Sequence, residues 1–299
     1  MTEYFWGAEM RVVFAKVLPL LLAAAFAGAA EVTPEAQPEL KLRIVSFNLR
    51  VPVDQPPHAW KQRKVRLLKD IKRMKPDIMG VQEATVFHHA ELKTLKGYRC
   101  IGASTDRTKR SEGVQIYYNA DRFMVINHTT TWLSDTPQVQ SFANGANLPR
   151  VVTIGVFKEK SSGRYFVVAN THLHHKNQLV CHPEHCRALL RALKPYLEDK
   201  MTVFITGDFN STPAGPVYQA LAKIFKDAHE VSETPAVQTE NRTFHGYRPR
   251  TGKPRGGHRI DFIWVTPDVR VLRYESVDNF DKDGLASSDH YPQCADVSF

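Results

Sequence analysis

Cysteine is scarce in this chain, which has four among 299 residues. The chain does not depend on cross-links, because 299 residues with 42% hydrophobic side chains can bury a core large enough to fold without them. It also lacks an internal repeat and any shift in composition after its Pro-rich segment, which excludes a repeat array and gives no sign of a second domain. We therefore expect a single domain from Leu42 to Phe299.

Acidic residues are fewer than basic ones, 31 against 40, so the net charge is +9. This imbalance is compatible with a phosphate-bearing or otherwise acidic partner, although a merely basic soluble protein explains it equally well. A Gly-x-Ser-x-Gly motif is also missing, and a serine nucleophile is therefore not expected.

The N-terminal segment has the features of a secretory signal peptide. Arg11 and Lys16 precede the apolar run 17–27, which is followed by the small residues that signal peptidase needs. We predict a signal peptide at residues 1–29 and a Pro-rich linker at 30–41. The mature protein would then be periplasmic or extracellular, without a stable membrane anchor. An uncleaved anchor is the alternative.

Two cysteines, Cys181 and Cys186, enclose the segment Cys-His-Pro-Glu-His-Cys and are close enough in sequence for a local disulfide. The other two, Cys100 and Cys294, could bond only if the fold brought them together. A zinc site within residues 181–186 would crowd four ligands into six residues, without the usual spacing of two ligand pairs. We therefore favour a disulfide or free thiols, and we assign these cysteines no catalytic role.

Apolar runs with strand or helix periodicity follow one another along the rest of the chain. Helical spacing predicts a basic amphipathic helix at 60–74 and another helix at 183–197. The predicted strands are 41–49, 76–83, 115–118, 123–133, 151–157, 165–173, 203–207, 259–265, 269–277 and 294–297. Many strands with interspersed helices indicate an α/β fold, in which a mixed sheet core of partly antiparallel character is covered by helices.

Polar side chains recur where the predicted strands end. Each has an ordinary explanation when it occurs alone, for example as a turn residue or as a charge at a helix N-terminus. Together they indicate a functional site, and they are Asn48, Glu83, His172, Asp208, Asn210, Asp261, Asp289 and His290. Carboxylates with an amide are hard oxygen ligands suited to Mg²⁺ or Mn²⁺, while histidines and amides can hold phosphate oxygens. The set predicts metal-assisted hydrolysis of a phosphate ester.

Six segments carry these residues in order: SFNLR, PDIMGVQEA, NTHLHH, TGDFNSTP, RIDFIWV and SSDHYP. The ordered series resembles the endonuclease/exonuclease/phosphatase superfamily, which has the DNase I-like fold, over essentially the whole chain after the linker. More narrowly, the chain resembles a compact, exported member of bacterial type. The resemblance implies a four-layer α/β/β/α sandwich of two packed mixed β-sheets flanked by helices. It also implies an active site at the sheet ends, with Mg²⁺ as the usual metal and Mn²⁺ as the alternative.

The resemblance implies two groups of site residues. The metal group is Asn48, Glu83 and Asp289. The catalytic group is His172, Asp208, Asn210, Asp261 and His290. In the implied mechanism, water activated by Asp208 attacks phosphorus with inversion, while His290, oriented or kept protonated by Asp261, contacts the phosphate. Arg150 and Glu112 also match family motifs and are secondary substrate-binding candidates, with a surface guanidinium and a loop acid as the alternatives.

Superfamily members cleave DNA, RNA, inositol phosphates and sphingomyelin, so the loops must decide the substrate. Two basic loops, 106–110 and 248–259, could approach the site and favour a polyanionic nucleic acid, although solvated loops explain them almost as well. The substrate-binding candidates in the second loop are Arg248, Arg250, Lys253 and Arg255.

We therefore expect an exported, monomeric, metal-dependent phosphodiesterase of nuclease type, acting on DNA or RNA. One alternative is a phosphomonoesterase acting on sugar or inositol phosphates. Another is a sphingomyelinase-like lipid phosphodiesterase, which ranks lower because no long apolar hairpin is present. A catalytically dead binding module ranks last, since Glu83, Asp208 and His290 are all present.

Overall fold

A computed structural model of the protein describes residues 39–106, 111–237, 242–248 and 259–299. The described residues belong to one compact unit, which ends at Phe299. The predicted signal peptide and most of the predicted linker lie outside the described residues, so both stay predictions. Among the described residues, no helix has both the length and the apolar character needed to cross a bilayer.

The first of two six-stranded sheets has the strand order β11-β12-β1-β2-β4-β3. Its strands are β1 (Lys41–Asn48), β2 (Ile78–Gln82), β3 (Tyr98–Ile101), β4 (Ile116–Asn119), β11 (Arg270–Ser276) and β12 (Gln293–Ser298). β1 and β2 are parallel, and Asn48 lies opposite Gln82 where both strands end. The residues that follow these two strands therefore emerge at the same edge of the sheet.

The second sheet has the order β5-β6-β7-β8-β10-β9. Its strands are β5 (Phe123–Trp132), β6 (Val151–Glu159), β7 (Tyr165–His172), β8 (Val203–Asp208), β9 (Lys226–Asp227) and β10 (Asp261–Val265). β7 and β8 are parallel, with His172 opposite Asp208 at their ends. β10 runs antiparallel to β8 and places Asp261, its first residue, opposite Asp208 as well. Three of the predicted site residues thus share one row of the sheet.

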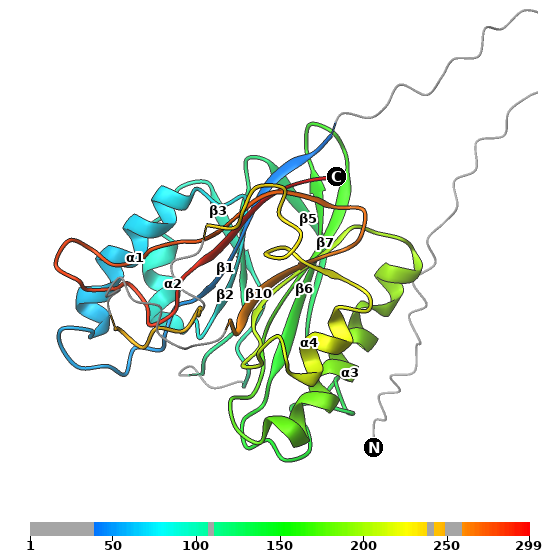
Figure 1. The fold of residues 1–299 in the computed structure, drawn as a ribbon, viewed down its shortest axis with the longest axis horizontal. Coiled ribbons are helices and arrows are strands. Elements are labelled where there is room, and N and C mark those ends of the chain that lie inside the picture. The colour runs from blue at the N-terminus through cyan, green and yellow to red at the C-terminus, as the bar shows by residue number, and fades with distance from the viewer. Residues whose placement is uncertain (1–38, 107–110, 238–241, 249–258) are drawn as a thin grey trace, which may run out of the picture. The chain divides into compact units, whose positions relative to one another are not determined.

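Helices lie on the outer face of each sheet, which gives four layers (Figure 1). The helices are α1 (Trp60–Met74), α2 (Val86–Leu92), α3 (Gln178–Glu198) and α4 (Pro216–Leu221). On the first sheet, Leu67 and Ile71 of α1 pack with Phe47. On the second, Leu189 of α3 packs with Ile205. The predicted α/β sandwich of two packed mixed sheets flanked by helices is confirmed.

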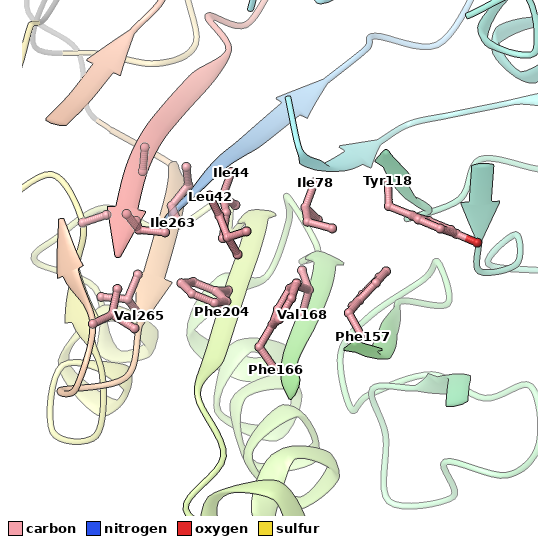
Figure 2. Packing of buried hydrophobic residues seen from close by; sticks show 14 of the residues in the cluster. Leu42, Ile44, Ile78, Tyr118, Phe157, Phe166, Val168, Phe204, Ile263 and Val265 are labelled. Carbon is pink, nitrogen blue, oxygen red and sulfur yellow. The ribbon is translucent and has the colours of Figure 1, made fainter. Parts of the chain in front are cut away.

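An apolar core built from the inner faces of both sheets joins them (Figure 2). Ile44 and Ile78 of the first sheet belong to this core together with Phe166 and Phe204 of the second. Phe166 stacks on Phe157 with ring centroids 5.6 Å apart. Burial of these side chains removes apolar surface from water, which stabilises the packing of one sheet on the other.

A buried polar layer interrupts this core close to the strand ends. Asn170 of β7 donates to the carbonyl oxygen of Val81 across the sheets at 2.7 Å, and its own Oδ1 accepts from Gln82 Nε2 at 2.7 Å. Thr206 Oγ1 also donates to Asn170 Oδ1, at 3.0 Å. Gly80 leaves room for this layer, because a Cβ there would lie 2.0 Å from Thr206 Oγ1. The hydrogen bonds tie the two sheets together next to the site.

The predicted elements are found, and the differences concern helix starts and short elements. α1 has the predicted bounds, whereas α3 begins at Gln178, five residues before the predicted start, and contains Pro183. Pro183 and Pro195 both lie inside α3, where each removes one backbone hydrogen bond to the preceding turn. The sequence patterns do not predict α2 and α4, because seven and six residues are too few to establish a helical period. They also miss β3, in which buried and exposed residues do not alternate, and the two-residue β9.

All four cysteines are free thiols. Cys181 and Cys186 both lie in α3, and five residues of helix span about 7.5 Å along the axis. A disulfide needs Cα atoms about 4.4–6.8 Å apart, so the proposed local bridge between these two does not form. Cys100 is in β3 and Cys294 in β12, which are separated by three strands in the sheet. The free-thiol alternative is the one found.

Candidate active site

The side-chain amide of Asn48 connects the ends of three strands, two from the first sheet and one from the second. Asn48 at the end of β1 is fully buried. Its Nδ2 lies 3.1 Å from Glu83 Oε1 and 3.0 Å from Asp208 Oδ2. Glu83 follows β2, and Asp208 ends β8. One Asn side chain therefore holds an acid from each sheet in a fixed relation.

The backbone around Glu83 is held in an uncommon conformation. Glu83 has φ 58° and Arg50 has φ 58°, both in the left-handed region that side chains other than Gly and Asn rarely adopt. Glu83 Oε2 accepts from the backbone N–H of Val51 at 2.8 Å. Such strain persists only where surrounding contacts enforce it, and it concentrates at functional sites. Here it directs the Glu83 carboxylate toward Asn48.

Asp208 and Asn210 form a tight polar turn after β8. Asp208 Oδ1 accepts from the backbone N–H of Asn210 at 2.9 Å, and Asn210 adopts φ 46°. Asn210 Nδ2 donates to Leu173 O at 3.0 Å and lies 3.1 Å from His172 Nε2. Burial, and then the charge of Asp261, raise the pKa of Asp208 to about 7. This pKa places the carboxyl where a general base works at neutral pH.

Asp261 and His290 form a buried pair beside Asp208. His290 Nδ1 lies 2.9 Å from Asp261 Oδ2, and its other nitrogen, Nε2, lies 3.7 Å from Asp208 Oδ2. Burial alone would lower the pKa of His290, but the charge and hydrogen bond of Asp261, with the charges of Asp208 and Asp289, raise it to about 10. His290 is therefore an imidazolium at neutral pH, and its Nε2–H points at the acids.

Glu112, Arg150 and His172 form a second polar group. Arg150 is buried and forms an ion pair with Glu112. Arg150 Nη1 also lies 3.2 Å from His172 Nδ1. Burial, followed by the charge of Arg150, lowers the pKa of His172 well below its usual value, so this imidazole is neutral. Both site histidines lie near acids, and His172 Nε2 is 3.5 Å from Asp208 Oδ2. Burial and the guanidinium of Arg150 keep His172 neutral, whereas His290 is hydrogen-bonded to the carboxylate of Asp261.

Arg50 is a pocket residue that the strand-end pattern does not single out. It is two residues beyond the end of β1, and its Nε lies 3.6 Å from Asp289 Oδ2. Its guanidinium also pairs with Asp54 at 2.9 Å. Its place in the segment SFNLR, immediately after a strand, is the sequence signal that could have identified it.

The donor set fits a hard divalent cation. Burial raises the pKa of Asp289, the charge of His290 lowers it, and the charge of Glu83 raises it further. A bound cation would offset the electrostatic repulsion that raises the pKa of such a carboxyl group. Glu83, Glu112 and His172 also offer ligand atoms within 4.8 Å of one another. The amide nitrogen of Asn48 faces Glu83 and Asp208, so in this arrangement Asn48 positions the carboxylates.

Most of these side chains line one pocket of about 440 Å³, whereas Asn48 and Asp261 lie behind it. The acids and histidines line it together with Arg50 and Arg150. Leu148 and Phe244 also line it, and both side chains are partly exposed, Phe244 at 46%. The pocket therefore combines anion-binding groups with apolar surface that is open to solvent.

The structure brings together ten of the predicted residues. They are Asn48, Glu83, Glu112, Arg150, His172, Asp208, Asn210, Asp261, Asp289 and His290. Arg248 is exposed and is not among the residues that line the pocket. Arg250, Lys253 and Arg255 lie outside the described residues, as do residues 107–110 of the other basic loop. The roles assigned to all these residues stay predictions.

One arginine of the second basic loop has a structural contact. Arg259 is buried, and it pairs with Asp227 at 2.9 Å and with Glu230 at 2.6 Å. Its charge is therefore neutralised within the fold and is not available to a polyanionic substrate.

Comparison with known proteins places these features in a family. The sequence pattern of the Endonuclease/Exonuclease/phosphatase family matches residues 45–290, which include eight of the residues named at the strand ends. Among curated proteins, Nocturnin of Drosophila melanogaster is 26% identical over 243 residues, covering 70% of this chain and 36% of that protein. The chain thus spans only about a third of the length of that relative.

Two solved structures match over nearly their whole length. An endonuclease/exonuclease/phosphatase from Bacteroides vulgatus is 30% identical, has a TM-score of 0.77, and covers 86% of this chain and 98% of that chain. The mannosyl-6-phosphatase of Bacteroides thetaiotaomicron is 27% identical, has a TM-score of 0.79, and covers 86% of this chain and 100% of that chain.

Proposed function

The chain belongs to the endonuclease/exonuclease/phosphatase family, and from this premise we propose that it is a divalent-metal-dependent phosphoesterase that hydrolyses a small phosphorylated molecule. The observation that carries the proposal is the joining of Glu83, Asp208 and the Asp261–His290 pair around one pocket. That arrangement provides a cation site, a general base and a donor to phosphate within one small volume.

Glu83 and Asp289 are the residues that would hold the cation, since their carboxylate oxygens are the ligands preferred by Mg²⁺ and Mn²⁺. Asn48 holds Glu83 in place by its hydrogen bond at 3.1 Å. When bound, the cation supplies Lewis-acid stabilisation of the negative charge that develops on the phosphate oxygens. Mg²⁺ is our proposed ion, with Mn²⁺ as its replacement.

The protein's own groups can carry the proton and position the substrate. Asp208, whose pKa is about 7, accepts a proton from the attacking water, which Asn210 helps to hold. His290, as an imidazolium, donates from Nε2 to a phosphate oxygen, and Asp261 keeps it charged. Because water attacks phosphorus directly and no enzyme nucleophile intervenes, the reaction inverts configuration at phosphorus.

The size and lining of the pocket favour a small phosphate ester over a long polymer. A volume of about 440 Å³ lies within the range of small-molecule sites. Arg50 lines the pocket and is about a third exposed, so its guanidinium can be shared between Asp54 and the second negative charge that a monoester carries and a diester lacks. Phe244 and Leu148 offer apolar surface for the rest of the molecule. The similarity to a mannosyl-6-phosphatase over 100% of that chain supports a phosphorylated sugar as the substrate class.

A nuclease-type phosphodiesterase is the second candidate function. The net charge of +9 and the basic segment 248–259 favour it, because phosphate backbones attract such surfaces. Its support lies mainly in side chains outside the described residues.

We also propose that the protein is exported and acts as a monomer without a membrane anchor. The support is the signal-like sequence of residues 1–29. N-terminal sequencing of the protein recovered outside the cytoplasm tests cleavage, and light scattering of the purified protein tests the monomer. An intact N-terminus at Met1 in membrane fractions would contradict the first proposal.

One parallel assay tests the substrate. The mature protein, from Ala30 onward, is incubated with mannose 6-phosphate, with single-stranded RNA and with DNA, each with Mg²⁺ and with chelator. We expect Mg²⁺-dependent release of inorganic phosphate from the sugar phosphate, and no release by a Glu83→Gln variant. Cleavage of nucleic acid alone would favour the second candidate. Inactivity on all three substrates would contradict both.

A further inference from the structure

A second cluster of metal-binding side chains lies in α3, away from the acids of the pocket. Cys181, His182 and His185 each offer a ligand atom within 4.8 Å of the others. All three side chains are buried, with 0%, 1% and 0% of their surface exposed. The rings of His182 and His185 have centroids 6.0 Å apart. A thiol and two imidazoles form a softer donor set than the carboxylates of the pocket, and soft sets select different ions.

His185 gives the second, independent indication of a ligand. Both of its ring nitrogens are buried and have no hydrogen-bond partner. Buried polar atoms in folded proteins are nearly always paired, so an imidazole without any partner needs an explanation. A neutral imidazole with a free lone pair is the form that binds a metal ion.

One ring nitrogen of His182 is hydrogen-bonded to a backbone carbonyl, as is usual for histidines that bind metals. Its Nε2 lies 2.7 Å from the carbonyl oxygen of His174, and a carbonyl can only accept, so Nε2 carries the proton. The lone pair is then on Nδ1. A backbone carbonyl on one ring nitrogen fixes the tautomer and frees the other nitrogen for the ion.

Cys181 completes the set. Its Sγ donates to Lys176 O at 3.4 Å, and because a carbonyl oxygen can only accept, the thiol carries its proton when no metal is bound. Metal binding would replace the S–H bond by a metal–sulfur bond and release one proton to solvent. Cys186 is not part of the cluster and packs in the apolar core under α3.

We propose that Cys181, His182 and His185 bind a zinc ion that is separate from the cation of the active site. Zinc suits two imidazoles and a thiolate, and its usual fourth position would be taken by water. The spacing Cys-His-x-x-His within one helix differs from the two-pair pattern of common zinc modules. For that reason sequence spacing alone argues against the site, whereas the structure places the three ligand atoms within 4.8 Å of one another.

The site would brace one rim of the pocket. Glu184, on the same helix, accepts from the backbone N–H groups of Asp135 and Asn144 at 3.1 and 2.8 Å, which anchors the loop before β6. His174, whose carbonyl oxygen contacts His182, also contacts Asn147 Oδ1 at 2.8 Å. Zinc at this position would therefore stiffen the segment that carries Leu148 into the pocket.

The test measures zinc directly. The mature protein is stripped with chelator, incubated with Zn²⁺ and excess Mg²⁺, desalted, and analysed for zinc by mass spectrometry and for Tm. A Glu83→Gln variant serves as the starting protein, so that zinc bound at the active site is removed from the count. We expect one retained zinc per chain and a raised Tm, both lost in Cys181→Ser and His185→Gln. The matched control Cys186→Ser should retain both.

Cobalt spectroscopy of the Glu83→Gln protein, in which the cluster is intact, tests for the sulfur ligand even if the cluster variants fail to fold. Co²⁺ added to the stripped Glu83→Gln protein should produce thiolate-to-metal charge-transfer absorption, which only a sulfur ligand gives. Its loss in Cys181→Ser, but not in Cys186→Ser, would assign that ligand. Failure of the Glu83→Gln protein to retain zinc, absence of the absorption, or full zinc retention by Cys181→Ser would each overturn the proposal.

Discussion

Asp261 Oδ2 lies 2.9 Å from His290 Nδ1 in a buried pair, of which His290 lines the pocket. The two residues come from β10 and from the loop before β12, which belong to different sheets. The pair therefore exists only when both sheets are packed on each other. It converts a histidine that burial would keep neutral into a cation with a pKa of about 10.

Asp261→Asn should lower the pKa of His290 toward neutrality, because the amide keeps a hydrogen bond but removes the charge. As pH rises through the new pKa, His290 loses its proton, so the alkaline limb of the activity profile should move to lower pH. We expect turnover at pH 8 to fall by about 100-fold. Titration of the His290 ring by NMR, with kcat measured across pH, checks this. An unchanged His290 pKa would contradict the role of Asp261.

Asp208→Asn should remove most turnover and leave the fold intact, because it deletes the proposed base without changing shape. The expected loss is about 10²- to 10⁴-fold in kcat. Asp227→Asn is the matched control, since Asp227 is a buried acid of the same sheet and pairs with Arg259 at 2.9 Å. Asp227→Asn should lower the free energy of unfolding by about 3 kcal/mol and leave kcat unchanged. Full activity of Asp208→Asn would disprove the assignment.

Gly80→Ala should destabilise the protein by about 2 kcal/mol, because overpacking forces neighbours apart. The new Cβ would lie 2.0 Å from Thr206 Oγ1 and 2.7 Å from Asn170 Oδ1. These atoms belong to the polar layer that ties the sheets together near the strand ends. Chemical denaturation measures the free energy of unfolding. Unchanged stability would mean that the layer can shift without cost.

The substitution Asp70→Asn should be more stabilising, relative to the wild type, at pH 8 than at pH 4. Burial raises the pKa of Asp70 in α1 to about 6, against about 3.9 in an unfolded chain. The folded state therefore binds this proton more tightly, and the stability it contributes is lost as pH rises from about 4 through about 6. The difference in unfolding free energy between variant and wild type should change by at most about 3 kcal/mol across that range. No change would show that Asp70 is ionised in the fold.

Neutralising the basic segment should separate the two candidate functions. The quadruple variant replaces Arg248, Arg250, Lys253 and Arg255 with Gln. Binding to DNA or RNA at low salt should weaken, and its salt dependence should become shallower, while sugar-phosphate hydrolysis is unchanged.

The matched control for that variant carries the same charge change away from the pocket. It replaces Lys72, Lys75, Lys93 and Lys96 with Gln. Equal effects of the two variants on nucleic-acid affinity would show that the loop contributes only through the general surface charge of the protein. Unchanged affinity in both would remove the support for the nuclease candidate.

Local patterns in the sequence predict most of the fold. The strand β8 and the helix α1 have clear apolar periods, so their positions follow from residues 203–207 and 60–74. The short elements α2, α4 and β3 escape this reasoning because they form where packing requires them. The start of α3 at Gln178 is missed because the residue before a proline is biased away from the helical conformation, yet residues 178–182 are helical despite Pro183.

The sequence by itself determined the chemistry of this protein: an ordered set of acids, amides and histidines, each placed after an apolar run, that narrows the reaction to phosphate-ester hydrolysis. Tertiary structure decided which of these side chains touch and what charge they carry. His172 and His290 have the same intrinsic pKa, and one is neutral beside Arg150 while the other is charged beside Asp261. Local sequence cannot contain that difference, because electrostatic interactions depend on distances between residues that lie far apart along the chain.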